Sequence, residues 1–408
     1  MAAAAPVRSA APAASTNGLP DPLPVDNTLS NNRTAVVDAL KSGNIGNLQT
    51  IEEYFNKYEL PRMTSHTLRQ ESESFSSREG DLPAYRRKFK SSYLNQAKQG
   101  PARAKLNEIV FEFLTKKIIA SKSTDNVLKY NAMLMIGDLT ADDAAPGKSP
   151  PLYPKAYQFL VSAAKSSNPK VDHLKVAALV GLQRQAEALA SSALGPAHEE
   201  LMTTMLALIG QQQPPEGRTA GGHAWIRASA ARVLGSLGYV GKDYAVPKAL
   251  GKVVMDETAL PSVRFAAVES LGQLNYPADA KLDIKPYVRE IGKLAVESIR
   301  KHLADRESRA ENRTAVADDL TTRRKLKSIV HSVNIALVGE GGRSGLLKLA
   351  GSQDKSGKPL TDVLRSIDTS LDKDAVDEIP DHVTKLEEVL QTAYGLPRST
   401  TDKAVVAQ

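Results

Sequence analysis

The chain has 408 residues, of which 41% are hydrophobic and only 5% aromatic, and its formal net charge is +7. It contains no cysteine, which excludes disulfide frameworks, thiolate nucleophiles and cysteine-ligated zinc. No apolar run is long enough to cross a bilayer as a helix. Because strands favour aromatic and β-branched residues, the shortage of aromatics beside much Ala and Leu predicts an all-α fold.

Residues 1–34 are rich in Ala, Pro, Ser and Asn and carry few charges. Such a composition buries too little apolar surface to fold, so a disordered tail or linker is predicted. No basic n-region followed by an apolar h-region is present, which leaves two alternatives open. Either a signal peptide has been trimmed from an exported, periplasmic bacterial protein, or the tail is native to a cytoplasmic one.

Residues 35–122 are predicted to form a basic, helical N-terminal region. The segment 81–122 holds ten Lys and Arg against three Asp and Glu. Its densest part is RRKFK, which supplies four candidate binding residues, Arg86, Arg87, Lys88 and Lys90. Surfaces that bind phosphate groups use such clusters, although a charge run more often forms a solvated helix face.

One pattern occurs twice in clear form, as IRASAARVLGSL at 226–237 and VRFAAVESLGQL at 263–274. In both copies the apolar residues follow one another at intervals of four, four and three, which places them on one face of a helix. Weaker copies are LKYNAMLMIGDL at 128–139 and LKVAALVGLQRQ at 174–185.

Another apolar helix is predicted before each copy, at 106–119, 153–165, 197–209 and 244–255. The steps between the copies, 46, 52 and 37 residues, match the length of a helical hairpin with its loops. A single hairpin leaves an apolar face uncovered, and stacking hairpins side by side buries it. Residues 123–340 are therefore predicted to form an α-solenoid.

The copy MDETALPSVRFAAVESLGQL resembles the second helix of a HEAT repeat, an armadillo-like unit, with Asp256, Pro261, Val263 and Arg264 in the family's places. The resemblance is firm over 223–276 and extends more weakly over roughly 100–340. It implies a superhelical array of helix pairs, which agrees with the fold expected from the spacing.

The resemblance also implies a structural ladder, in which an arginine of one repeat bonds to the aspartate in the turn of a neighbouring repeat. Arg227, Arg264 and Asp256 are the residues to which this role would fall. Two copies depart from the pattern, because Lys129 and Lys175 replace the arginine and no aspartate stands at the matching distance before either.

Residues 341–408 are predicted to form an acidic helical cap and tail, since 368–388 holds eight acids against two lysines. The single tryptophan, Trp225, directly precedes a repeat copy. It is interpreted as an apolar plug against the previous repeat, and the alternative is a binding hot spot beside the loop 211–222.

No set of residues points to catalysis. GSQDKSGKP at 351–359 has five residues between its glycines where a phosphate loop has four, and Pro359 stands where that motif needs Ser or Thr. GEGGRSG at 339–345 follows a helix instead of opening one, so both segments are interpreted as surface turns. The seven histidines show no metal-ligand spacing, and neither HExxH nor GxSxG occurs. The chain is predicted to be non-enzymatic, with no catalytic residue, cofactor or metal.

Three functions from different classes remain as hypotheses. The favoured one is a scaffold that binds a protein partner in a solenoid groove, or that self-associates through basic 81–122 and acidic 368–388. The second is nucleic-acid binding through 81–122, with RRKFK echoed by RRKLK at 323–327. The last is a HEAT-like glycosylase or lyase, for which no carboxylate and aromatic set is identified.

Overall fold

The computed structural model describes residues 20–71, 81–97, 100–144, 146, 149–311, 315–349 and 357–397. Within these ranges the chain is helical, and the one extended pairing is an isolated antiparallel bridge between Thr140 and Leu152. The all-α expectation is therefore confirmed for the described residues. The chain divides into two compact units, Met1–Leu160 (unit 1) and Val161–Gln408 (unit 2).

Unit 1 consists of short helices, several of which change their winding part way. Their bounds are η1 Asn27–Asn32, α1 Arg33–Ser42, α2 Leu48–Glu53, η2 Tyr54–Glu59, η3 Pro61–Thr64, α3 His66–Glu71, α4 Leu82–Phe89, η4 Lys90–Leu94, α5 Pro101–Phe113, η5 Leu114–Ile119 and α6 Asn126–Gly137. The segments η2, η4 and η5 are π-helical continuations of α2, α4 and α5. Caps define two of the starts, since the side chains of Asp81 and Asp125 accept backbone N–H groups of α4 and α6.

An aromatic cluster forms the core of unit 1. The rings of Tyr54, Phe55, Phe89 and Tyr93 contact one another with centroids 5.2–6.1 Å apart. All four side chains are buried. Because aromatic side chains bury a large apolar area, a few of them are enough to hold these short helices together.

The prediction that residues 1–34 form a disordered tail is wrong for residues 20–34. Residues 1–19 lie outside the described residues, whereas residues 20–34 are ordered and pack against η2 and η3. The amide of Leu23 donates to Thr64 Oγ1 at 2.8 Å, and the amide of Asp26 donates to the Lys57 carbonyl at 2.8 Å. These long-range hydrogen bonds hold a segment whose composition predicts little burial of apolar surface.

Unit 2 contains longer helices, and its boundary with unit 1 falls inside α7. The bounds are α7 Pro154–Lys165, η6 Pro169–Val171, α8 Asp172–Ala190, α9 Pro196–Gly210, α10 Ala220–Leu237, η7 Lys242–Tyr244, α11 Ala245–Met255, α12 Pro261–Gly272, α13 Lys285–Glu311, α14 Ala315–Val338, α15 Leu346–Leu349, α16 Gly357–Asp372, η8 Val376–Glu378 and α17 Ile379–Tyr394.

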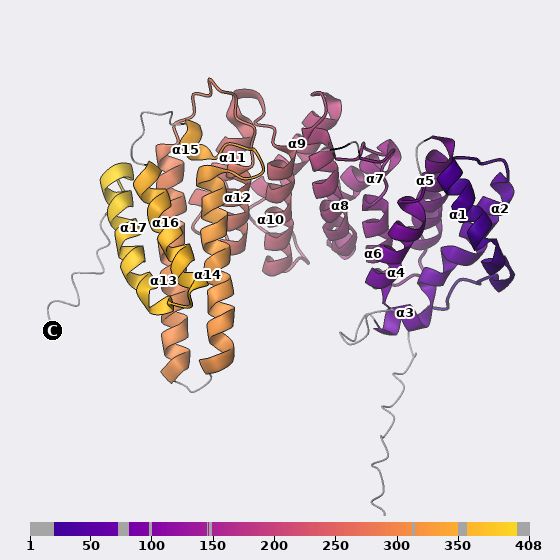
Figure 1. The fold of residues 1–408 in the computed structure, drawn as a ribbon, viewed down its shortest axis with the longest axis horizontal. Coiled ribbons are helices and arrows are strands. Elements are labelled where there is room, and N and C mark those ends of the chain that lie inside the picture. Colours follow the sequence, from indigo (N-terminus) through magenta and orange to yellow (C-terminus); the bar gives the residue numbers. More distant parts are fainter. Residues whose placement is uncertain are drawn as a thin grey trace, which may run out of the picture. The chain divides into compact units, whose positions relative to one another are not determined.

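The helices α8 to α14 pack in two layers (Figure 1). In one layer α8 lies against α10, α10 against α12 and α12 against α14, and in the other α9 lies against α11 and α11 against α13. The apolar stripes of the two clear copies are buried. In the copies at 226–237 and 263–274, no residue at the four apolar positions is more than 1% exposed.

The glycine near the end of the repeat pattern allows neighbouring helices to approach closely. A Cβ on Gly235 of α10 would lie 2.9 Å from the Cα of Ser270 on α12. A Cβ on Gly272 of α12 would lie 1.9 Å from the carbonyl oxygen of Ile335 on α14. The same position of the pattern therefore makes the same kind of contact in two successive steps.

The C-terminal helices cover the last hairpin. α16 packs on α14 and on α17, and α17 packs on α13 (Figure 1). The glycine-rich segment 339–345, predicted as a turn, is one, with positive φ at Gly339, Gly341 and Gly342. Of the second predicted turn, 351–359, residues 351–356 lie outside the described residues and the remainder opens α16.

Candidate functional site

The predicted ladder is present at one junction between repeats. Arg227 Nη2 lies 3.8 Å from Asp256 Oδ2, and Arg227 Nε donates to the Ile209 carbonyl at 3.1 Å. Burial acts to raise the pKa of Asp256, but hydrogen bonds from Thr258 and the charge of Arg227 hold that pKa below its usual value. The pair is mostly buried and joins α10 to the turn that follows α11.

Arg264 takes the equivalent place without an acidic partner. Its Nε donates to the Val254 carbonyl at the end of α11, at 2.8 Å, as Arg227 does to the end of α9. Its Nη2 is buried and has no hydrogen-bond partner among the described residues. The contact between the arginine and a helix-end carbonyl is thus common to both copies, whereas only Arg227 has a carboxylate partner among the described residues. The carbonyls are available because the last carbonyls of a helix lack intrahelical donors.

The basic cluster of unit 1 divides into two pairs with different surroundings. Arg86 Nε and Lys90 Nζ lie 3.9 and 3.1 Å from the two carboxylate oxygens of Asp138. Arg87 and Lys88 are exposed and, with Arg62, line a cleft of about 980 Å³. No carboxylate of the described residues forms an ion pair with Arg87 or Lys88.

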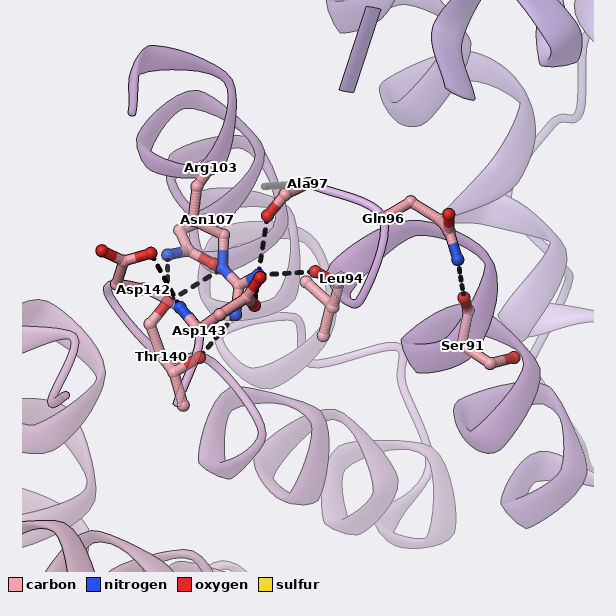
Figure 2. A network of polar contacts seen from close by, with 9 residues as sticks. All are labelled: Ser91, Leu94, Gln96, Ala97, Arg103, Asn107, Thr140, Asp142 and Asp143. Atoms are coloured by element: carbon pink, nitrogen blue, oxygen red, sulfur yellow. Dashed lines mark hydrogen bonds and ion pairs between the residues drawn. The ribbon is translucent and has the colours of Figure 1, made fainter. Parts of the chain in front are cut away.

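A neighbouring cation of the basic region has a structural role. Arg103 is 5% exposed, and Figure 2 shows its guanidinium surrounded by acceptors. It donates to the carbonyls of Leu94 and Ala97 at 2.6 and 2.8 Å, to Thr140 at its carbonyl and hydroxyl, and to Asp143 Oδ1 at 3.1 Å. Arg103 therefore ties α5 to the end of η4 and to the segment after α6.

Half of the eight acids in the C-terminal segment 368–388 form ion pairs within the described part of unit 2. These carboxylates meet four cations of α13 and α14, in the pairs Arg300–Glu387, Arg306–Asp377, Arg323–Asp374 and Lys327–Asp372. Two of these cations belong to the RRKLK motif at 323–327. These pairs join acids and cations that are far apart in the sequence, so the surface carries less unpaired charge than the sequence suggests.

Trp225 is 40% exposed on α10, so its interpretation as a buried plug is wrong. The side chain that does fill the space beside the 211–222 loop is His223, which is 3% exposed. The alternative interpretation of Trp225, a binding hot spot, stays a prediction.

The 211–222 loop is held by a network that the sequence analysis missed. Arg218 binds the Asp172 carboxylate through two hydrogen bonds, from Nε at 2.6 Å and from Nη2 at 2.8 Å. Its Nη1 lies 3.4 Å from His223 Nδ1, and His223 Nε2 donates to the Gln211 carbonyl at 2.7 Å. Since Nδ1 faces a donor, His223 is neutral, and burial together with Arg218 and Arg227 lowers its pKa.

One sequence signal marks this region in retrospect. Lys175 stands at the repeat position of Arg227 and Arg264, and the loop after α9 carries a cation, Arg218, one residue before the position that matches Asp256 of the best copy. The reversal of charge indicates that this junction is built differently from the next two. The repeat pattern alone does not predict the Arg218–Asp172 pair, because the two residues are 46 positions apart in the sequence.

No helix of the described residues combines the length and the hydropathy needed to cross a membrane. In the same part of the chain, no group of three or more His, Asp or Glu side chains is arranged to hold a metal ion. Comparisons with protein-family models, with curated proteins and with solved structures found no match to this chain.

Proposed function

We propose that this protein is a non-enzymatic binding scaffold made of stacked HEAT-like hairpins, and that the unit 1 cleft binds an acidic segment of a protein partner. The observation that carries the proposal is the state of Arg87 and Lys88. Both are exposed in a cleft of about 980 Å³, whereas their neighbours Arg86 and Lys90 lie beside Asp138. Two cations that pair with no carboxylate of the described residues, held beside a third, form a complementary surface for carboxylates.

The repeat architecture supports the scaffold part of the proposal. Successive hairpins pack in two layers, their pattern glycines make equivalent close contacts, and Arg227 and Arg264 bond to equivalent carbonyls. These repeated contacts are what a solenoid of HEAT-like units requires. Such an array gives an extended surface for a protein partner, which is where the groove predicted from the sequence would lie.

Nucleic acid is the less favoured partner. The aromatic residues among the basic ones, Tyr85, Phe89 and Tyr93, are at most 9% exposed, so they offer no faces on which bases can stack. The second basic motif is engaged with the acids of α16 and the turn that follows it. Two free cations in one cleft are also few beside the row of phosphate contacts that nucleic acids use.

Self-association through opposite charges is likewise disfavoured. Four of the eight acids that would attract unit 1 of a second copy already pair with α13 and α14. We therefore expect the light scattering of the full chain to be the same at low and at high ionic strength. An increase in scattering at low salt would support charge-driven assembly instead.

The proposed partner class can be tested by fluorescence anisotropy of the full chain with two probes. One probe is a labelled Glu-rich peptide, and the other is single-stranded DNA of the same charge. We expect the peptide to bind more tightly, and the double substitution Arg87→Ala/Lys88→Ala to weaken it about tenfold or more, since two charge-assisted contacts are lost.

The matched control is Lys116→Ala/Lys122→Ala, which removes the same charge from exposed positions of the same unit. It should leave peptide binding nearly unchanged. Equal weakening by both double variants would show diffuse attraction and would contradict a specific cleft. Tighter binding of the DNA, with loss on Arg87→Ala/Lys88→Ala, would favour the nucleic-acid alternative.

A further inference from the structure

A buried lysine in unit 2 stands where the repeat pattern places a bonded arginine. Arg227 and Arg264 each donate through Nε to the carbonyl at the end of the preceding helix. Lys175 of α8 occupies that position in an earlier copy and is only 3% exposed. Nevertheless, its ammonium forms no hydrogen bond or ion pair with any described residue. A buried cation without a partner is costly, which makes this lysine exceptional.

The nearest carboxylate is already occupied. Asp172, one turn before Lys175 on the chain, has both oxygens bound by Arg218. Burial and the like charge of Arg218 lower the pKa of Lys175, and Asp172 opposes them. The local charges therefore supply a second cation beside Lys175 instead of a counter-ion.

Lys175 lines a pocket of about 600 Å³ formed by the end of α7, α8, α9 and the following loop. This volume lies within the range of about 300–1,000 Å³ that is typical of small-molecule sites. Apolar wall comes from Ala164, Ala207, Leu208 and Pro215. The pocket thus combines apolar wall with several charged side chains, of which Lys175 is the buried one contributed by α8.

The other charged side chains around the pocket have ion-pair or hydrogen-bond partners. Lys165 Nζ lies 2.8 Å from Glu200 Oε1, and the Tyr239 hydroxyl donates to Glu199 Oε1 at 2.9 Å. Arg218 is bound to Asp172. Among the described lining residues, Lys175 is therefore the one ionised side chain without a partner. One unpaired cation matches one negative charge, and the two glutamates near the rim disfavour a ligand with more.

We propose that this pocket binds a small organic monocarboxylate with an apolar body, whose carboxylate is seated on Lys175. The ligand carboxylate accepts a hydrogen bond from Lys175, as main-chain carbonyls do from Arg227 and Arg264. Its apolar part lies along Ala207 and Leu208, and the hydroxyl groups of Thr203 and Ser166 lie within the same lining. The site shares no lining residue with the unit 1 cleft, so this proposal is independent of the proposed protein partner.

The test is calorimetric titration of the full chain with octanoate, and with octanol as a matched probe without the charge. Octanoate is expected to bind with one site per chain and at least about tenfold more tightly than octanol, because a charge-assisted hydrogen bond forms only with the carboxylate. The variant Lys175→Met should abolish this preference. Equal affinity for the two probes, or an unchanged octanoate titration in Lys175→Met, would overturn the proposal.

Two further variants separate binding from folding. Lys129→Met removes the lysine at the same repeat position of unit 1 and should bind octanoate as the wild type does. Ala207→Trp adds bulk at an exposed wall position and should block octanoate while leaving the thermal midpoint nearly unchanged.

The thermal midpoint of ligand-free Lys175→Met distinguishes a ligand-binding lysine from one that stabilises the fold. Loss of an unpaired buried charge should maintain or raise that midpoint, whereas loss of a structural contact would lower it. A lowered midpoint together with octanoate binding in Ala207→Trp would overturn the proposal.

Discussion

Arg218 and Asp172 join the loop before α10 to the start of α8 through two parallel hydrogen bonds, Nε to Oδ2 at 2.6 Å and Nη2 to Oδ1 at 2.8 Å. The arginine side chain is 2% exposed and the aspartate side chain 22%. A forked pair of this kind fixes both the distance and the orientation of the two segments.

Arg218→Ala is expected to lower the free energy of unfolding of unit 2 by about 2–4 kcal/mol, because it leaves Asp172 partly buried without its partner. The urea midpoint measures this loss. Arg218→Lys keeps the charge but not the fork, and should recover only part of the stability. Full recovery by lysine would show that charge alone matters at this position.

The network around His223 predicts a dependence of stability on pH. The folded-state pKa of His223 is lowered, mainly by burial and then by the charges of Arg218 and Arg227, against the opposing effects of Gln211 and Asp172. The unfolded chain therefore binds a proton more readily than the folded one. The contribution of His223 is fully present above about pH 6.5 and is lost as the pH falls toward the folded-state value.

Urea unfolding at pH 7.5 and at lower pH measures this effect. The wild type should lose more stability on acidification than His223→Asn, which cannot take up the proton. The same loss in both proteins would place the acid sensitivity elsewhere in the chain.

The close contact at Gly272 predicts a strong effect of a single methyl group. In Gly272→Ala the new Cβ would meet the backbone of Ile335 on α14, which has no flexible end to move. We expect a loss of at least about 1–3 kcal/mol in the free energy of unfolding. Gly221 of α10 has no atom within 4 Å of the corresponding Cβ, so Gly221→Ala should be neutral or stabilise by up to about 1 kcal/mol. Similar destabilisation by both variants would argue against the contact.

Arg343 links the turn after α14 to the ends of two earlier helices. Its Nη1 donates to the carbonyls of Gly235 and Gln273, and its Nη2 donates to that of Ser236 at 2.9 Å. Burial lowers the pKa of this arginine. Arg343→Ala should lower the thermal midpoint of unit 2, because carbonyls at the ends of α10 and α12 lose their donor.

The control for Arg343 is Arg365→Ala. Arg365 is exposed and, among the described residues, pairs only with Asp362, one turn away, so its loss should change stability by less than about 0.5 kcal/mol. If both arginine variants unfolded at the wild-type temperature, the cap formed by Arg343 would contribute nothing measurable.

Local patterns predicted the repeat helices well. The apolar positions of 226–237 and 263–274 are buried as the spacing requires, because side chains three and four residues apart lie on one helix face. Composition did not predict the order of residues 20–34. Leu23 and Asp26 are ordered by hydrogen bonds to Thr64 and Lys57, and composition contains no information on such distant contacts.

The candidate sites show where sequence information ends. RRKFK reads as one basic cluster, but Arg86 and Lys90 lie one turn apart on a face beside Asp138, while Arg87 and Lys88 face a cleft. The acid that divides the cluster is 48 residues from Lys90. Likewise, nothing near Lys175 in the sequence tells that Asp172 is already bound by Arg218.

The sequence by itself determined the repeat helices and their buried stripes, because both depend on the spacing of residues within a few turns. The tertiary structure alone decided which charges are free. Within the described part of the chain, Lys175 lacks a partner and Lys327 has one, because pairing depends on contacts between helices that are distant in sequence. A charge is available to a ligand only when the fold leaves it unpaired, and that condition is set by packing.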